Sequence, residues 1–345
     1  MISPLNWGLG HATRLVPVVK SLLNEGHYVL LAGEGSSLHV LREEFSLLEW
    51  IEMQGFNVSL SKGQHQWLKL MLQLPALIRS IRSDKKHVSR IIKEKNIDLI
   101  ISDHRYGFYS ENVYSIIITH QTHPYIGRTF SFLRPITNYI SRRWLSRFNE
   151  CWIPDDASLR LAGSLARPVK GIKSTYLGIS SRLMIADNTV SFKEKADVLI
   201  ILSGPEPQRE ELESTLLSQL KKSGLRTVIL GACPGKSIRE EGNIIVLPHV
   251  GPADQKALIE NSRFIICRSG YSTLMDLLYC RRRALLIPTP GQFEQEYLAK
   301  RMYESFGFRM ICQKELGVQS VFRWYEELSF AKCGKDFNSF TLPPF

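Results

Sequence analysis

The sequence predicts an α/β protein made of two Rossmann-like halves, each built on a parallel sheet. Three observations lead to this prediction. Short apolar runs alternate along the chain with amphipathic stretches, as in a series of βαβ units. Several of these runs are almost continuous Val, Ile and Leu, which is typical of strands that helices cover on both faces. The 345 residues are enough for two domains, each with its own hydrophobic core.

The apolar runs are the predicted strands, and the amphipathic stretches between them are the predicted helices. We predict strands, in chain order, at residues 28–32, 97–102, 115–119, 150–153, 198–203, 227–230, 244–247, 264–268 and 284–288. We predict helices at residues 13–25, 36–44, 66–94, 208–223, 252–261, 272–280 and 292–305. Pro75 should kink the third helix or split it in two, because proline removes a backbone donor.

The alternation of strands and helices pauses at residues 155–187, which are weakly periodic and rich in Gly, Ser, Lys and Arg. A fresh series of strands begins at Val198. We therefore predict an N-terminal domain at residues 1–186 and a C-terminal domain at residues 187–345. The two halves are expected to face each other across a central cleft.

Composition excludes several classes of protein. The chain has no run of about 18 uncharged apolar residues, so no membrane span is expected. Its N-terminus lacks the basic and apolar regions of a signal peptide. The six Cys form no C-x-x-C pair, which excludes the usual zinc and redox motifs and fits free thiols in the cytoplasm.

The net charge of +11 is concentrated in the first half of the chain. Residues 1–186 carry 23 Lys and Arg against 14 Asp and Glu, whereas residues 187–345 carry 21 against 19. Two basic segments with interspersed apolar and aromatic residues, 62–95 and 128–147, fit docking on an anionic membrane, which would be the inner face of the plasma membrane. The alternative for residues 62–95 is a core-facing helix with a solvated basic back. Nucleic acid is not an expected partner, because no RNA-binding motif accompanies the charge.

The first motif with chemical meaning contains Gly8, Gly10 and His11, just after the apolar run 2–5. Glycines after a strand permit a tight turn and close approach of the backbone to a polar ligand or phosphate. Thr13 stands where the dinucleotide fingerprint has its third glycine, which disfavours NAD. His11 is placed to act as a base. The alternative is an ordinary glycine turn followed by a histidine at a helix end.

Asp103 comes directly after the predicted strand 97–102. The carboxyl ends of parallel strands are where α/β sheets bind ligands. A carboxylate there could orient His11, as the Asp of a catalytic triad orients its base. The alternative is a loop carboxylate paired with Arg105.

A second glycine loop opens the C-terminal half. Gly204 follows the strand 198–203, and Arg209 lies at the start of the next helix, where it could meet a phosphate. The alternative is a helix N-terminus whose acidic residues, Glu206, Glu210 and Glu211, complement the helix dipole.

The most informative stretch runs from Phe264 to Asp276 and joins a strand, a turn of small residues and a helix. Amides of Ser269 and Gly270, nearby hydroxyl groups and the helix N-terminus make an anion pocket. Asp276 lies one turn into the helix and could accept hydrogen bonds from ribose. A second polar loop, 288–296, follows the next strand at the same edge of the sheet. Together, the two loops predict a nucleotide-sugar site.

These residues resemble the C-terminal half of family 28 glycosyltransferases, and the loop 8–11 resembles the glycine loop of their N-terminal half. The resemblance spans most of the chain and is most specific in residues 198–303. It implies a GT-B fold with a UDP-sugar donor held mainly by the C-terminal domain and an acceptor on the N-terminal domain. One member of this family adds N-acetylglucosamine to a lipid-linked muramyl-pentapeptide.

The resemblance also implies roles for individual residues of the donor site. Asp276 stands where the family usually has a ribose-binding Glu, and Glu296 replaces the second Gln of a pair near the donor sugar. The backbone of residues 249–250 would face the base of the nucleotide. The implied donor site comprises Gly204, Arg209, His249, Val250, Arg268, Ser269, Gly270, Thr273, Asp276, Gln292, Gln295 and Glu296.

We therefore predict an inverting glycosyltransferase that moves a hexose or N-acetylhexosamine from a UDP-sugar to a hydroxyl acceptor, with a lipid-linked or cell-envelope glycan as the expected acceptor. His11, oriented by Asp103, would be the base. No metal or other cofactor is expected, because the chain lacks a D-x-D motif and fixed amides, a helix dipole and Arg can stabilise the diphosphate. Two alternatives remain open: a nucleotide-sugar epimerase of the same fold, and a non-catalytic subunit that binds a UDP-sugar.

Overall fold

The computed structural model describes residues 1–55, 73–158, 161–186, 195–204, 207–221, 223–231, 237–316 and 323–344. The chain forms two compact units. The first contains the described residues up to Ser180 and those from Phe337 onward, and the second contains Ser181–Asp336. The predicted boundary lies after Ala186, and the predicted second domain includes the C-terminal tail. No helix in the described part of the chain is long and apolar enough to cross a membrane.

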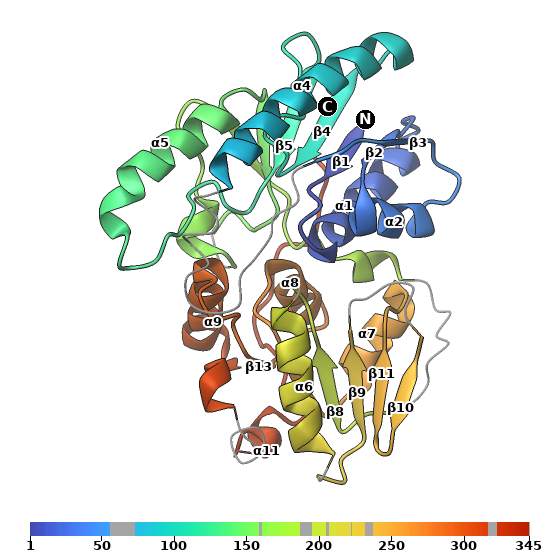
Figure 1. The fold of residues 1–345 in the computed structure, drawn as a ribbon, viewed down its shortest axis with the longest axis vertical. Coiled ribbons are helices and arrows are strands. Elements are labelled where there is room, and N and C mark those ends of the chain that lie inside the picture. Colours follow the sequence, from blue (N-terminus) through green and yellow to red (C-terminus); the bar gives the residue numbers. More distant parts are fainter. Residues whose placement is uncertain are drawn as a thin grey trace. The chain divides into compact units, whose positions relative to one another are not determined.

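The first unit is an α/β unit with a seven-stranded sheet (Figure 1). Its elements are β1 (Ile2–Pro4), α1 (Leu9–Asn24), β2 (Leu31–Gly33), α2 (Gly35–Glu44), β3 (Trp50–Glu52), α4 (Leu74–Lys95), β4 (Leu99–Asp103), β5 (Tyr114–Ile118), η1 (Ser131–Leu133), α5 (Arg134–Leu145), β6 (Glu150–Ile153), η2 (Gly163–Ala166) and β7 (Lys173–Tyr176). The strands are parallel and follow the order β3-β2-β1-β4-β5-β6-β7. The order reverses between β1 and β4, which makes this the switch point where open α/β sheets bind ligands.

The second unit repeats this plan (Figure 1). Its elements are η3 (Arg182–Ile185), β8 (Val198–Ile201), α6 (Gln208–Leu220), β9 (Thr227–Leu230), β10 (Arg239–Glu241), β11 (Ile244–Leu247), α7 (Pro252–Asn261), β12 (Phe264–Cys267), α8 (Tyr271–Tyr279), β13 (Leu285–Leu286), α9 (Phe293–Phe306), β14 (Arg309–Met310), η4 (Gln313–Glu315) and α11 (Tyr325–Leu328). The strand order is β10-β11-β9-β8-β12-β13-β14, and among these described strands the β10–β11 pair is antiparallel and the other neighbouring pairs are parallel. Here the switch point lies between β8 and β12. The predicted α/β fold with two parallel sheets is confirmed.

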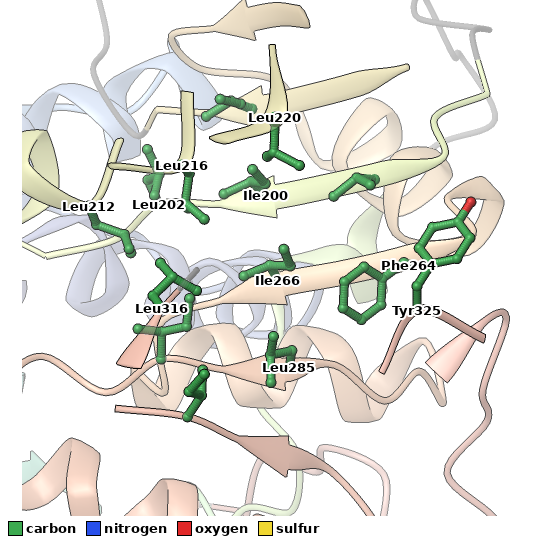
Figure 2. Close-up of a cluster of buried hydrophobic side chains, with 14 of the residues drawn as sticks. Ile200, Leu202, Leu212, Leu216, Leu220, Phe264, Ile266, Leu285, Leu316 and Tyr325 are labelled. Carbon is green, nitrogen blue, oxygen red and sulfur yellow. The ribbon is translucent and has the colours of Figure 1, made fainter. Parts of the chain in front are cut away.

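Residue spacing explains the core of the second unit (Figure 2). Val198 and Ile200 alternate along β8 and so point to one face of the sheet. Leu212, Leu216 and Leu220 recur every four residues and form one face of α6. All five side chains are almost fully buried in one cluster. The apolar face of α6 and the apolar side of β8 therefore pack into the same core.

Helix α4 packs on the core of the first unit through one face only. Val88 and Ile91 are buried in a cluster with Ile100 and Phe108. The basic residues of the helix lie on its exposed side: Arg79, Arg82, Lys86, Arg90 and Lys93. This part of the basic segment therefore matches the alternative of a core-facing helix with a solvated back. Residues 56–72 lie outside the described residues, and Pro75 lies in the first turn of α4, where proline is tolerated.

The C-terminal tail belongs to the first unit. Ile179 pairs with Ser339 in a parallel bridge, and the Thr341 amide donates to the Leu177 carbonyl at 2.9 Å. Gly178 has a φ of +75°, and a Cβ atom at this position would lie 2.4 Å from the Ser339 carbonyl oxygen. Only glycine therefore lets the tail approach the chain this closely.

Candidate active site

The switch point of the first sheet gathers the predicted catalytic residues. The turn after β1 contains Gly8, whose φ of +83° favours glycine, and leads into α1, which carries Gly10 and His11 in its first turn. Asp103 ends β4, and Thr119 and His120 directly follow β5. Because these strands are parallel neighbours of the same sheet, their carboxyl ends bring the side chains to one edge.

The centre of this site is a buried ion pair between Arg14 of α1 and Asp103. The Nε of Arg14 donates to Oδ2 of Asp103 at 2.8 Å, and Nη2 donates to Oδ1. Burial alone would raise the pKa of Asp103, but the charge of Arg14, followed by that of His11, holds this pKa well below its usual range. Asp103 is therefore a carboxylate at neutral pH. The alternative pairing of Asp103 with Arg105 is wrong, because Arg105 pairs with Asp84 of α4.

Three histidines surround the guanidinium of Arg14. Its Nη2 lies 2.8 Å from the Nδ1 atoms of both His11 and His104, and its Nη1 lies 2.8 Å from Nδ1 of His120. His104 has a left-handed backbone with a φ of +57°, and such conformations in residues other than glycine often mark functional sites. Burial lowers the pKa of His104 to about 3, so this imidazole is neutral.

His11 is the histidine best suited to act as a base. Its Nδ1 lies 3.3 Å from Oδ2 of Asp103, and its side chain is 15% exposed. Among the described residues, the hydrogen bonds of His11 run through Nδ1. The Nε2 atom is therefore left to accept a proton from a substrate hydroxyl group, with Asp103 in the position that orients the ring.

The cluster contains side chains of the kinds that bind metal ions, but the guanidinium of Arg14 already lies among them. His11, Asp103 and His104 offer two ring nitrogens and a carboxylate within 4.8 Å of one another. The Nη2 atom of Arg14 contacts all three groups. A metal ion in this cluster would have to displace the guanidinium.

The second sheet gathers the predicted donor residues at its own switch point. Gly204, with a φ of +99°, follows β8, and Ser269 and Gly270 follow β12, which is the parallel neighbour of β8. A Cβ atom on Gly270 would lie 3.5 Å from Oγ of Ser203, so the two loops lie side by side. Gly270 caps α8, whose N-terminal amides face this loop. Arg209 lies in the first turn of α6, and Thr273 lies buried in the first turn of α8.

Asp276 is held by groups of its own unit. Its Oδ1 accepts from Oγ of Ser181 at 2.6 Å, and its Oδ2 accepts from Nε2 of Gln255 at 2.9 Å. Burial raises the pKa of Asp276 to about 6. The same network includes Arg182, which donates to Gln255 and to the Val250 carbonyl, next to His249. Both carboxylate oxygens already have partners, so a ribose contact of Asp276 stays a prediction.

Arg268 is fully buried and connects three segments. Its guanidinium donates to the carbonyls of Ile287 and Pro288 and to the carbonyl of Gln208. Burial lowers its pKa to about 10. These contacts hold the end of β12 against the following strand and the start of α6, so Arg268 supports the loops rather than reaching a ligand itself.

The loop before α9 is fixed by its own side chains. Oε1 of Gln295 accepts from the Thr289 amide at 2.9 Å, and Nε2 of Gln295 donates to Oε1 of Gln292 at 2.6 Å. Oε1 of Glu296 accepts from the Gly291 amide at 3.1 Å. The Gln295 carbonyl in turn accepts from Oγ of Ser269 at 2.8 Å. This network joins the two polar loops that are predicted to form the nucleotide-sugar site.

Sequence reasoning missed several residues of these sites. Arg14 lies three positions after His11 on the same helix, and this spacing places both residues on one face. An arginine in a helix is, however, also typical of a solvent-exposed position. His104 follows Asp103 directly. Ser181 and Gln255 gave no signal, because their partner Asp276 lies far away in the sequence.

The C-terminal unit carries a recognisable domain. Residues 239–333 match the family described as Glycosyltransferase family 28 C-terminal domain. The chain is a glycosyltransferase with a family 28 C-terminal domain. The match contains the Ser269–Gly270 turn, helix α8 and the loop before α9. The resemblance that these residues carry is therefore confirmed.

Solved glycosyltransferases share the fold of the whole chain. The glycotransferase of kitacinnamycin has a TM-score of 0.67 and 15% identity, over 95% of this chain and 89% of that chain. MurG of Acinetobacter baumannii has a TM-score of 0.55 and 14% identity, over 95% and 89%. UGT89C1 of Arabidopsis thaliana, complexed with UDP-L-rhamnose, has a TM-score of 0.57 and 11% identity, over 95% and 92%. The glycosyltransferase thus has the GT-B fold. No curated protein matches its sequence.

Proposed function

We propose that this glycosyltransferase moves a hexose or N-acetylhexosamine from a UDP-sugar to a hydroxyl acceptor, with inversion at the anomeric carbon and without a metal ion. The observation that carries the proposal is the cluster of His11, Asp103 and Arg14 at the switch point of the first sheet. It offers an imidazole nitrogen for a proton and a buried carboxylate to hold the ring.

The reaction is a single displacement. The acceptor oxygen attacks the anomeric carbon while its proton passes to Nε2 of His11, and the bond from this carbon to the diphosphate oxygen breaks. Attack from the face opposite the diphosphate inverts the configuration. Asp103, ionised because Arg14 lowers its pKa against the effect of burial, stabilises the imidazolium that forms.

Groups of the second unit support the departing diphosphate. The amides of Ser269 and Gly270 and the N-terminus of α8 provide fixed dipoles for the phosphate charge. Among the similar structures, UGT89C1 is complexed with UDP-L-rhamnose, which supports a nucleotide-sugar donor here. Metal independence is supported by Arg14, whose guanidinium already neutralises the carboxylate of the histidine cluster.

A panel of UDP-sugars tests the proposal. Incubation with lipid extracts as acceptor should release UDP, and NMR of the product should show the inverted linkage. His11→Ala should lower kcat by on the order of 10²-fold, as expected for loss of a general base. His39→Ala, on the exposed side of α2, is the matched control. Conversion of UDP-N-acetylglucosamine without any acceptor would instead support the epimerase, and UDP binding with no turnover would support a binding subunit.

We also propose that the acceptor is lipid-linked and that the enzyme binds the cytoplasmic face of the membrane through α5. Phe132 of the preceding turn η1 and Ile136 and Tyr139 of α5 follow one another at four- and three-residue spacing and are 73%, 57% and 70% exposed. Arg134 and Arg143 are exposed as well, and residues 128–147 contain no acidic residue. Such a surface combines apolar insertion with attraction to anionic lipids.

Liposome sedimentation tests the membrane proposal. The protein should co-sediment with vesicles that contain anionic lipid, and less so as salt rises. Phe132→Ser with Tyr139→Ser should abolish this, whereas Tyr28→Ser, which alters another exposed aromatic residue, should not. Equal binding to neutral and anionic vesicles would overturn the proposal.

A further inference from the structure

The guanidinium of Arg14 has too few hydrogens for its neighbours. Its Nη2 carries two hydrogens but faces three acceptors: Oδ1 of Asp103 and the Nδ1 atoms of His11 and His104. Asp103 takes one hydrogen because charge-assisted bonds are the stronger ones. The two histidines, both at 2.8 Å, therefore compete for the other.

The histidine that loses this competition has a second option. Its Nδ1 can carry a hydrogen itself and donate to Asp103, which lies 3.3 Å from Nδ1 of His11 and 3.4 Å from Nδ1 of His104. One ring thus has its hydrogen on Nε2 and accepts from Arg14, and the other has its hydrogen on Nδ1. In the state with both rings neutral, the two rings must hold opposite tautomers.

His11 can act as the base in only one of these two tautomer states. His11 can accept a proton at Nε2 only when its own hydrogen is on Nδ1. His104 must then have its hydrogen on Nε2, which lies 2.8 Å from Oγ1 of Thr119. This hydroxyl group can accept that hydrogen, or it can donate its own when His104 holds the other tautomer.

We propose that His104 and Thr119 are positioning residues that set the tautomer of His11 through their competition for one hydrogen of Arg14. The inference deepens the proposed function, since it concerns the base of that reaction. Thr119 is fully buried, so it acts through His104 and not on a substrate.

Substitutions at Thr119 shift the equilibrium between the two tautomer states in a defined direction. In Thr119→Val a methyl group replaces the hydroxyl group, so Nε2 of His104 loses its partner in either tautomer. An orphaned buried N–H is the rarer of the two outcomes in proteins, which favours the tautomer without a hydrogen on Nε2. The variant also removes the acceptor of the Gln121 amide, a loss that is the same for both tautomers. His104 then keeps its hydrogen on Nδ1 and donates to Asp103, and the hydrogen of Arg14 passes to His11. His11 is held with Nε2 protonated, and kcat should fall by on the order of 10²-fold. Thr119→Ser keeps the hydroxyl group and should retain activity.

The substitution His104→Asn separates control of the tautomer from a simple loss of packing. Asn tolerates the positive φ, and its side-chain oxygen accepts from Arg14 without any tautomer change. In the double variant His104→Asn with Thr119→Val, His11 keeps its hydrogen on Nδ1, so activity should return toward the wild-type value. A merely structural role predicts that the two substitutions add their losses.

Nitrogen-15 NMR of histidine-labelled protein reads the tautomers directly, with signals assigned from His11→Ala and His104→Asn. We expect opposite tautomers for His11 and His104 in the wild type and a protonated Nε2 of His11 in Thr119→Val. Identical tautomers in the wild type, or an unchanged His11 signal in Thr119→Val, would overturn the inference. This readout needs no turnover, so failure of the proposed glycosyl transfer would be seen separately, as absence of UDP release by a protein with coupled tautomers.

Discussion

Arg14→Met removes the positive partner of a fully buried carboxylate while keeping an apolar side chain of similar length. Asp103 is 0% exposed, and Arg14 is 3% exposed and donates to both of its oxygens. Breaking a buried pair by removing one partner costs about 3–5 kcal/mol, because the remaining charge is left in a poorly polar environment. We expect a loss of this size in the free energy of unfolding at neutral pH.

The pH dependence of this loss identifies its cause. In the wild type the pKa of Asp103 is held well below its usual value, so its contribution to stability is present above the pKa of the unfolded state and is lost only on strong acidification. In Arg14→Met the largest cause that lowers this pKa is removed, while burial, the largest cause of all, remains opposed only by His11 and His104. The pKa of Asp103 therefore rises, and stability is lost as pH rises through the folded pKa. The difference between the two proteins should therefore shrink as pH falls from about 7 to about 4.

Urea unfolding at several pH values measures this difference. Arg128→Met, at an exposed position of the same unit, should change stability by no more than about 0.5 kcal/mol. Adding Asp103→Leu to Arg14→Met should recover much of the loss, because the unpaired charge is gone. A loss in Arg14→Met that is the same at every pH would refute the reasoning, because a packing defect alone would behave in that way.

Two further predictions concern the second unit. Burial raises the pKa of Asp276 from 3.8 to about 6. The contribution of this carboxyl group to stability is therefore lost as pH rises through about 6. Above that pH the ionised form lowers the free energy of unfolding by about 3 kcal/mol. Asp276→Asn should therefore raise the thermal midpoint above about pH 7 and leave it nearly unchanged below about pH 4; a gain of equal size at both pH values would contradict this. Gly270→Ala should leave the fold intact, because the new Cβ meets only Oγ of Ser203 at 3.5 Å, but it should weaken UDP binding by at least about tenfold by calorimetry, since the methyl group obstructs close approach of a phosphate. Unchanged affinity would remove this turn from the donor site.

The sequence predicts the central strands well and the edge strands poorly. The strands β6, β9 and β11 coincide with their predicted ranges, because each is a short apolar run buried by helices. The predicted ranges include none of the four edge strands, β3, β7, β10 and β14. Each is short and contains charged, polar or exposed residues, as edge strands usually do.

Helix α5 was also not among the predicted helices. Its apolar residues Ile136 and Tyr139 are exposed, so they do not mark a core-facing side that periodicity can reveal. The segment was recognised instead by its charge, as a basic stretch with aromatic residues.

For the candidate site, the sequence predicts which strand ends meet but not which side chains pair. His11 and Asp103 come together because β1 and β4 are parallel neighbours, which the rule for ligand sites at strand ends anticipates. The pairing of Asp103 with Arg14 rather than Arg105 depends on the direction of each side chain. The carboxylate of Asp276 meets Ser181, which lies in the weakly periodic segment 155–187 and gave no signal.

The role of His11 as the base is tested most directly by UDP release from UDP-sugars in the presence of lipid extract, measured for the wild type and His11→Ala. We predict release by the wild type, a loss on the order of 10²-fold in His11→Ala, and equal UDP affinity of the two proteins by calorimetry. Full activity of His11→Ala on an acceptor that the wild type uses would contradict the assignment of the base and of the catalytic site in the first unit.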